Sequence, residues 1–214
     1  MSQKNLESHL QSIRLLLSHL HKEVTTLESQ NETVLTALHS FEDQAQNDDL
    51  TGVYRRKEFF KRWKEVLKTC EELQENCGII LVDIDHFKKI NDQLGHQTGD
   101  EVLQSVGRLL KQYQSPHCFS GRYGGEEFAI VVQGADADVM SMAERVRRSV
   151  EKVRGQTIGP HGKPDPERES WAVTLSAGVA TSKQLGYDAQ ALLKAADEAL
   201  YQAKANGRNR IKGA

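Results

Sequence analysis

The feature that most constrains the fold is a seven-residue repeat of apolar side chains in residues 1–47, a segment without glycine or proline. A helix packed on its own domain follows a 3.6-residue period, so a fixed seven-residue repeat would drift about 20° per heptad around it. The two seams of the repeat are Leu10, Leu17, Val24, Asn31 and Leu38, and Leu6, Ile13, Leu20, Leu27, Val34 and Phe41. The repeat predicts a coiled-coil dimerisation helix over residues 1–47, followed by a second domain over residues 48–214.

Asn31 is the lone polar residue of these seams. A pair of amides hydrogen-bonded across a parallel two-stranded interface would fix its register and oligomer number. A local defect is the alternative explanation. The pattern favours a parallel dimer, although the mixture of Ile and Leu in the seams leaves a trimer open.

Two adjacent carboxylates, Glu126 and Glu127, follow Gly124 and Gly125 and precede the apolar run 128–132. A Gly-Gly pair can adopt the positive φ angles of a tight two-residue hairpin, and it lets a phosphate approach the main chain. Two carboxylates at such a tip would attract a hard divalent cation. An isolated motif of this length is also compatible with a solvated acidic turn.

A second acidic pair, Asp83 and Asp85, ends the apolar run 78–85, which we expect to form a buried strand. If this strand pairs with the hairpin strand, Asp83 and Glu126 would face each other. They could then bridge two magnesium ions about 4 Å apart, an arrangement suited to phosphoryl transfer. The alternative is that these aspartates cap the next helix, and we expect one of the two to do so.

Five motifs in order resemble the GGDEF family of diguanylate cyclases, enzymes that condense two GTP molecules into cyclic di-GMP. The resemblance covers about residues 48–213, and the signature is present in its Glu-Glu (GGEEF) variant. The motifs are a turn at 48–52, a nucleotide-binding stretch at 83–100, the signature at 122–128, a late strand at 173–180 and a terminal motif at 204–209. The resemblance implies an α/β fold with a mixed, mostly antiparallel sheet flanked by helices, a palm-like nucleotidyl cyclase domain behind the long coiled-coil helix.

The resemblance also implies roles for individual residues. Two Mg²⁺ or Mn²⁺ ions per active site would be bound by Asp83, the main chain of Ile84, Glu126 and Glu127. Catalytic roles fall to Glu126, Glu127 and Lys88. Contacts to GTP fall to Phe87, Asn91, His96, Asp100, Gly124, Gly125, Lys204 and Arg208. The general base is not identified by the sequence, since Glu127 could either bind the second metal or help deprotonate the attacking hydroxyl.

In the family, Asn91 and Asp100 correspond to residues that contact guanine, and a bidentate contact is worth about 1–3 kcal/mol of base discrimination. We therefore expect GTP rather than ATP. Asp100 could instead cap an amphipathic helix over 101–113. Lys204 and Arg208 could likewise be ordinary helix-end residues of a helix over 188–206.

Each domain would hold one GTP, so the reaction needs two domains. A homodimer through the coiled coil raises their effective concentration, with residues 44–49 as the hinge. Members of the family commonly carry an inhibitory Arg-x-x-Asp motif, but Ser115 and Cys118 occupy its charged positions here. Product feedback through that site should be absent or weak. Arg55 also departs from the family pattern, which has Asn in the turn motif.

The remaining features of the sequence limit the possible functions. A formal net charge of -2 argues against bulk nucleic-acid binding. No apolar run approaches the roughly 20 residues of a membrane span, and the start lacks a signal-peptide pattern. Three cysteines without metal-ligand spacing favour unpaired thiols in a reducing, cytoplasmic setting. A non-catalytic nucleotide receptor and a cyclase making another dinucleotide are the rival functions, and an upstream sensor or regulatory partner is left open, as is the role of loop 155–170.

Overall fold

The computed structural model describes residues 3–159, 161–165, 167 and 170–214, and within the first helix the side chains of residues 9, 13–35 and 46. The chain divides into two compact units, Met1–Ala45 and Gln46–Ala214. Each is described by itself.

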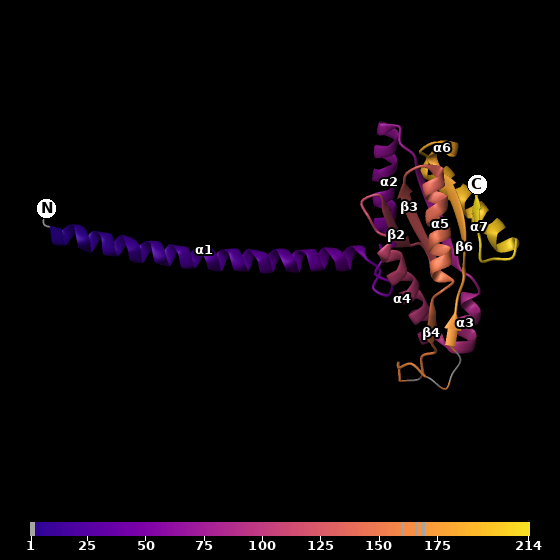
Figure 1. The fold of residues 1–214 in the computed structure, drawn as a ribbon, viewed down its shortest axis with the longest axis horizontal. Helices are drawn as coiled ribbons and strands as arrows, with labels where there is room; N and C mark the ends of the chain where they lie inside the picture. Colours follow the sequence, from indigo (N-terminus) through magenta and orange to yellow (C-terminus); the bar gives the residue numbers. More distant parts are fainter. Residues whose placement is uncertain (1–2, 160, 166, 168–169) are drawn as a thin grey trace. The chain divides into compact units, whose positions relative to one another are not determined.

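The N-terminal unit is formed by helix α1 (Gln3–Gln46), drawn in indigo in Figure 1. Its described seam residues are Ile13, Leu17, Leu20, Val24, Leu27 and Val34, which are 45% to 60% exposed. The seam residues Leu6, Leu10, Leu38 and Phe41 lie outside the described side chains. A row of exposed apolar side chains at heptad spacing is the surface through which helices pair in a coiled coil. Among the described residues, every helix is too short or too polar to cross a membrane.

The second unit is built on a five-stranded sheet with strand order β2-β3-β1-β6-β7. The pairs β2–β3, β3–β1 and β1–β6 are antiparallel, and β6–β7 is parallel. The predicted mixed, mostly antiparallel sheet flanked by helices is therefore confirmed. The elements are α2 (Arg56–Leu73), β1 (Cys77–Ile84), α3 (Phe87–Leu94), α4 (His96–Gln112), β2 (Cys118–Arg122), β3 (Glu127–Gln133), α5 (Asp136–Val150), β4 (Arg154–Gln156), β5 (Ser170–Ala172), β6 (Leu175–Thr181), α6 (Ser182–Leu185), α7 (Ala189–Ala205) and β7 (Ile211–Gly213).

Helices cover both faces of this sheet, which gives three layers. All eight residues of β1 are buried, as expected of a central strand covered on both sides. Ile80, Val82 and Ile84 join a core cluster with residues of α3, α4 and α5, and Figure 1 shows α5 running along the sheet. Ile79 and Leu81 point to the other face and join residues of α2 and α7. The two-residue period of the strand thus directs Asp83 to the α7 face.

Segment 155–170 contains structure that the sequence analysis missed. We expected an exposed loop there, but Arg154–Gln156 pairs antiparallel with Ser170–Ala172 to form a separate two-stranded sheet. The indole of Trp171 occupies the space that a Cβ on Gly155 would need. Three-residue strands carry too few alternating side chains for their period to be recognised in the sequence.

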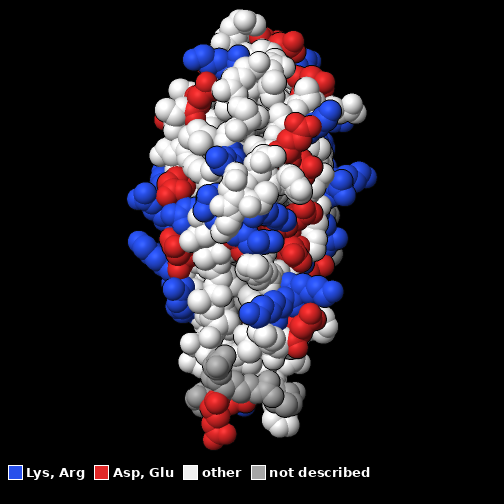
Figure 2. Space-filling model, turned by 90° about the vertical axis from the view of Figure 1, so that its right-hand side faces the viewer, with Lys and Arg blue, Asp and Glu red and all other residues white. Residues whose placement is uncertain are grey.

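Charged side chains of both signs are mixed on the molecular surface. Figure 2 shows Lys and Arg interspersed with Asp and Glu over the face that it presents. This distribution agrees with the formal net charge of -2. This face shows no large area of positive charge that would attract a polyanion.

Candidate active site

Asp83 is the buried acidic residue at the end of the central strand. The residue is 6% exposed, and the strand register places Glu127 of β3 directly opposite it. We expected Glu126 in that place, but the register differs by one residue, and the Glu126 carbonyl oxygen accepts a 3.3 Å hydrogen bond from the Ile84 amide. The Lys204 ammonium of α7 lies 2.7 Å from Asp83 Oδ2. Two neighbouring strands and one helix therefore bring three carboxylates and one ammonium together.

The hairpin tip that carries the glutamates differs from the predicted two-residue turn. Residues 123–126 connect the strands, and the Glu127 carbonyl oxygen accepts hydrogen bonds from the amides of Tyr123 (2.8 Å) and Gly124 (3.2 Å). Neither Gly124 nor Gly125 has a positive φ, so that part of the prediction is wrong. A Cβ on Gly124 would instead collide with the Glu127 carboxylate. Glycine at this position leaves room for the Glu127 carboxylate and is not needed for an unusual backbone angle.

An ion pair fixes the base of the hairpin. Arg122 Nη1 lies 3.1 Å from Asp48 Oδ1, and Arg122 Nη2 donates to the Gly125 carbonyl at 2.8 Å. Burial alone would raise the pKa of Asp48, but hydrogen bonds from Thr51 and the charge of Arg122 lower it overall. The acidic turn motif and the signature thus form one rigid corner.

The three carboxylates repel one another, and Lys204 offsets part of that repulsion. Burial raises the pKa of Asp83, with a smaller rise from Asp85, while Lys204 counteracts the shift. Burial also raises the pKa of Glu126 and of Glu127, and the charge of Asp83 raises both further. Burying like charges together is costly unless a cation is present.

The donor set fits hard divalent cations, because carboxylate and main-chain oxygens are the ligands that Mg²⁺ and Mn²⁺ prefer. Among the described residues, however, no group of three or more His, Cys, Asp or Glu side chains already surrounds a common point. In this structure the cation beside Asp83 is the Lys204 ammonium. The predicted ligand set stays a prediction, with Lys204 marking where positive charge is needed.

Helices α3 and α4 carry the predicted nucleotide contacts. The Asn91 carboxamide and the Phe87 ring both lie against Gly99, next to Asp100. The side chains of Lys88, His96 and Asp100 are exposed, and none of them makes a hydrogen bond or ion pair with a described residue. Helix α4 begins at His96 after Gly95, five positions earlier than we expected, so Asp100 lies inside the helix and does not cap it.

The prediction that Asp83 or Asp85 caps the next helix is also wrong. Helix α3 starts after His86, which has a left-handed φ of 59°, and no side chain caps it. Asp85 instead accepts hydrogen bonds from the hydroxyls of Thr174 and Ser176, each at 2.7 Å, and from the Asn209 amide at 3.0 Å. Asp85 therefore ties three chain segments together.

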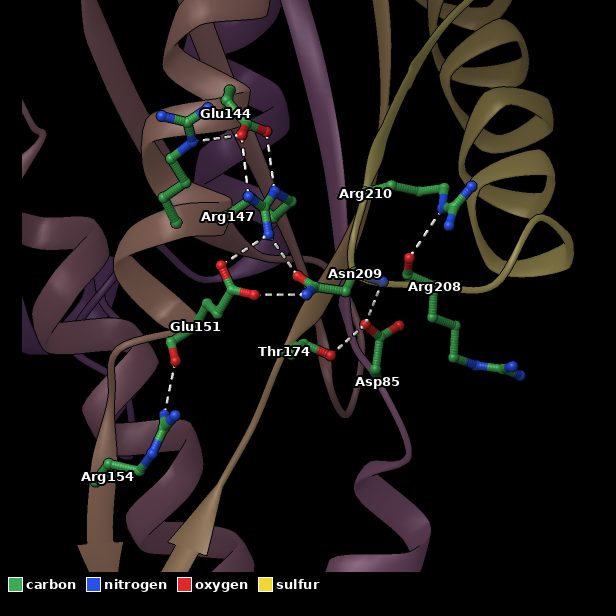
Figure 3. A network of polar contacts seen from close by, with 10 residues as sticks. Asp85, Glu144, Arg147, Glu151, Arg154, Thr174, Arg208, Asn209 and Arg210 are labelled. Carbon is green, nitrogen blue, oxygen red and sulfur yellow. Dashed lines mark hydrogen bonds and ion pairs between the residues drawn. The ribbon is translucent and has the colours of Figure 1, made fainter.

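The turn after α7 extends that network, which Figure 3 shows from close by. Asn209 Oδ1 accepts a 2.6 Å hydrogen bond from Arg147, and Asn209 Nδ2 donates to Glu151 at 2.7 Å. Arg208 and Asn209 have left-handed φ angles of 61° and 44°. Arg208 lies close enough for its charge to lower the pKa of Asp83. Lys204 lies in the last turn of α7 and the Arg208 amide donates to the Ala203 carbonyl at 3.1 Å, so helix-end roles for both residues remain compatible with their contacts to the site.

Sequence reasoning missed Arg147 and Glu151 entirely. Both lie on the outer helix α5 or at its end, in a segment that carries no motif. The half-buried Arg147 guanidinium also donates to Glu144 at 2.9 and 3.0 Å, which lowers the pKa of Glu144 to about 2. In the sequence, Arg147 and Glu151 look like residues of any solvent-exposed helix face.

Residues 115–118, which occupy the place of the inhibitory motif, form a short uncharged turn. Ser115 and Cys118 exchange two main-chain hydrogen bonds at 2.8 and 3.2 Å. The Cys118 thiol is buried, and burial raises its pKa to about 11. The three cysteines are free, as expected.

Comparisons with known proteins agree with one another. A family model described as "Diguanylate cyclase, GGDEF domain" matches residues 45–210. The response regulator PleD of Caulobacter vibrioides is 39% identical over 176 residues, which cover 82% of this chain and 37% of PleD. The chain thus spans well under two thirds of that curated relative.

Two solved structures are similar over the whole domain. The coiled coil and GGDEF domain of DgcB from Caulobacter crescentus, crystallised with c-di-GMP, has 30% identity and a TM-score of 0.74, covering 91% of this chain and 99% of that one. The active GGEEF domain of a diguanylate cyclase from Vibrio cholerae has 32% identity and a TM-score of 0.63, covering 74% and 96%.

Proposed function

The chain belongs to the GGDEF family of diguanylate cyclases, and on that premise we propose that it condenses two GTP molecules into cyclic di-GMP. Each 3'-hydroxyl attacks the α-phosphate of the other GTP. A new P–O bond forms, the bond to the β-phosphate breaks, and two pyrophosphates leave. The observation that carries the proposal is the placement of Glu127 opposite Asp83 in the strand register, with Lys204 2.7 Å from Asp83 Oδ2.

The carboxylates of Asp83, Glu126 and Glu127, with the main chain of Ile84, are the proposed ligands of two Mg²⁺ or Mn²⁺ ions. When bound, such ions supply charge neutralisation at the phosphates and activation of the hydroxyl. With such ions bound to Asp83, Lys204 would be available to the triphosphate. Its ammonium, together with Lys88 and Arg208, stabilises the charge that develops on the leaving pyrophosphate.

Asn91 and Asp100 are the proposed guanine contacts. The position of Asn91 against Gly99, next to Asp100, supports a shared site for one base between α3 and α4. Phe87 and His96 border this site, and Gly124 and Gly125 let the phosphates approach the hairpin main chain. Replacing Asp100 with Ser should relax the preference for GTP over ATP, and unchanged preference would contradict the assignment.

One domain holds half of the reactants, so we place the reaction in a homodimer formed through α1. The exposed heptad seam supports this assembly, as does the likeness to a solved coiled coil and GGDEF domain. Leu20→Lys with Leu27→Lys should abolish dimers and activity together. Leu15→Lys is the matched control, because Leu15 is 67% exposed but lies outside both seams. Full activity in a monomer proven by sedimentation would refute the requirement.

The uncharged turn at Ser115 and Cys118 supports weak or absent product feedback at that site. Cyclic di-GMP titrated at micromolar concentration onto Asp83→Ala protein should give little heat in calorimetry. Tight binding there would contradict this part of the proposal.

The function itself is tested by incubating the full chain with GTP and Mg²⁺ and resolving the products by mass. We expect cyclic di-GMP and pyrophosphate, with loss of both in Asp83→Asn. Glu198→Gln is the control, since Glu198 is exposed and pairs only with the surface Lys194 at 3.8 Å. A different dinucleotide, or GTP recovered intact from a folded dimer, would refute the proposal.

A further inference from the structure

A pocket of about 500 Å³ lies beside α3, and its wall is completed by the end of α5, by strands β4 and β5, and by the residues 173–174 that follow β5. On α3 the residues Lys89, Ile90 and Gln93 line it. Helical periodicity places Asn91 on the other side of the same helix, and neither Phe87 nor Asn91 lines the pocket. The pocket is therefore separate from the proposed nucleotide contacts. Its volume is in the range of sites for small organic ligands.

The inner wall of the pocket is apolar. Trp171 and Val173 are 3% and 4% exposed, and Ile90 and Leu94 pack against the same core cluster. The Trp171 indole nitrogen is buried and makes no hydrogen bond to a described residue. A flat apolar surface next to a buried donor suits an aromatic ring that carries an acceptor.

The rim of the pocket is cationic. The exposed Lys89 ammonium makes no ion pair with a described residue, and Arg154 donates to the main-chain carbonyls of Glu151 (2.6 Å) and Val153 (2.8 Å). The pocket also contains the carboxylates of Asp85 and Glu151, but their oxygens already accept hydrogen bonds from the protein, as Figure 3 shows for both. Lys89 and Arg154 are exposed, whereas Asp85 is 4% exposed and Glu151 is ion-paired with Arg147 at 3.1 Å, so the cations are the charged groups that a ligand reaches most readily.

We propose that this pocket binds a planar aromatic anion, at a site separate from the GTP site and independent of the proposed cyclase activity. The ring lies against the partly buried Ile90 and Leu94, and the anionic group meets Lys89 and Arg154. Asp85 belongs both to the pocket wall and to the network that holds Asn209.

The test is calorimetric titration of the full chain with 1-naphthyl phosphate, without GTP or divalent metal. We expect one ligand per protomer with a dissociation constant of about 0.5 mM, given about 15 non-hydrogen atoms at ordinary ligand efficiency. Lys89→Ala and Arg154→Ala should each weaken binding about fivefold or more. Lys68→Ala should not, because Lys68 is an exposed lysine of α2 that pairs only with Glu72 at 3.8 Å.

Two further measurements distinguish binding in the pocket from nonspecific binding to apolar surface. The neutral 1-naphthalenemethanol should bind about tenfold more weakly than the phosphate, since it cannot use the cations. Ala172→Trp places a large side chain at an exposed position of the pocket wall and should remove binding while circular dichroism stays unchanged. Absence of heat at millimolar ligand, equal affinity for the neutral compound, or binding that survives Ala172→Trp would each overturn the proposal.

Discussion

Replacing Asp85 with alanine should lower the free energy of unfolding of the second unit by about 3 kcal/mol. The carboxylate is 4% exposed and accepts three hydrogen bonds, from the Thr174 and Ser176 hydroxyls and the Asn209 amide. A buried donor left without an acceptor costs about 1–3 kcal/mol. Since the two hydroxyls can rotate to other acceptors, the sum lies near the lower end of three such costs.

Urea denaturation followed by tryptophan fluorescence measures this change, because the chain has two tryptophans and both lie outside α1. Asp85→Asn should lose less than Asp85→Ala, since its amide oxygen still accepts a hydrogen bond and the shape is kept. Glu198→Ala is the control and should change stability by less than about 0.5 kcal/mol. A loss below about 1 kcal/mol in Asp85→Ala would refute the idea that Asp85 clamps these segments.

Three further predictions follow from the site and the core. Burial raises the pKa of Asp83, Glu126 and Glu127, so above about pH 4 the folded domain binds more protons than the unfolded chain. The stability of the domain should therefore fall as the pH rises, which urea midpoints measured from pH 4 to 8 can show. Glu126→Gln should make this dependence of stability on pH less steep. Lys204→Ala removes the offsetting charge and should raise the pKa of Asp83 further in a carboxyl-carbon NMR titration, whereas an unchanged titration would contradict the pairing. Gly178→Ala should cost about 3 kcal/mol in thermal unfolding, because its Cβ would overlap the α7 main chain, and a wild-type melting temperature would contradict that packing.

The sequence was enough to predict the sheet, the long helix and the acidic strand end. Continuous apolar runs and a heptad repeat are long signals with few alternative explanations. The buried strand ending at Asp83 appears as β1, and the helix predicted over 188–206 appears as α7 with Asp188 at its N-cap. Motif order was sufficient to place Lys204 near the site, since it lies on a helix packed against that strand.

The errors came from contacts between distant segments. A sequence cannot show that Asp85 finds hydrogen-bond donors 89 and 124 residues away, so capping the nearby helix was the natural expectation. The Gly-Gly pair was read for its backbone freedom, whereas Gly124 is needed because the Glu127 side chain fills the space beside it. Arg147 gave no signal at all, because an arginine on a helix face is usually solvated.

Counting bound Mn²⁺ by electron paramagnetic resonance, in the full chain with a GTP analogue that cannot be cleaved between its α- and β-phosphates, tests the central claim most directly. If Asp83, Glu126 and Glu127 form one cation site, wild type should hold two ions per protomer. Asp83→Asn should then hold at most one. The same stoichiometry and affinity in both proteins would contradict the account.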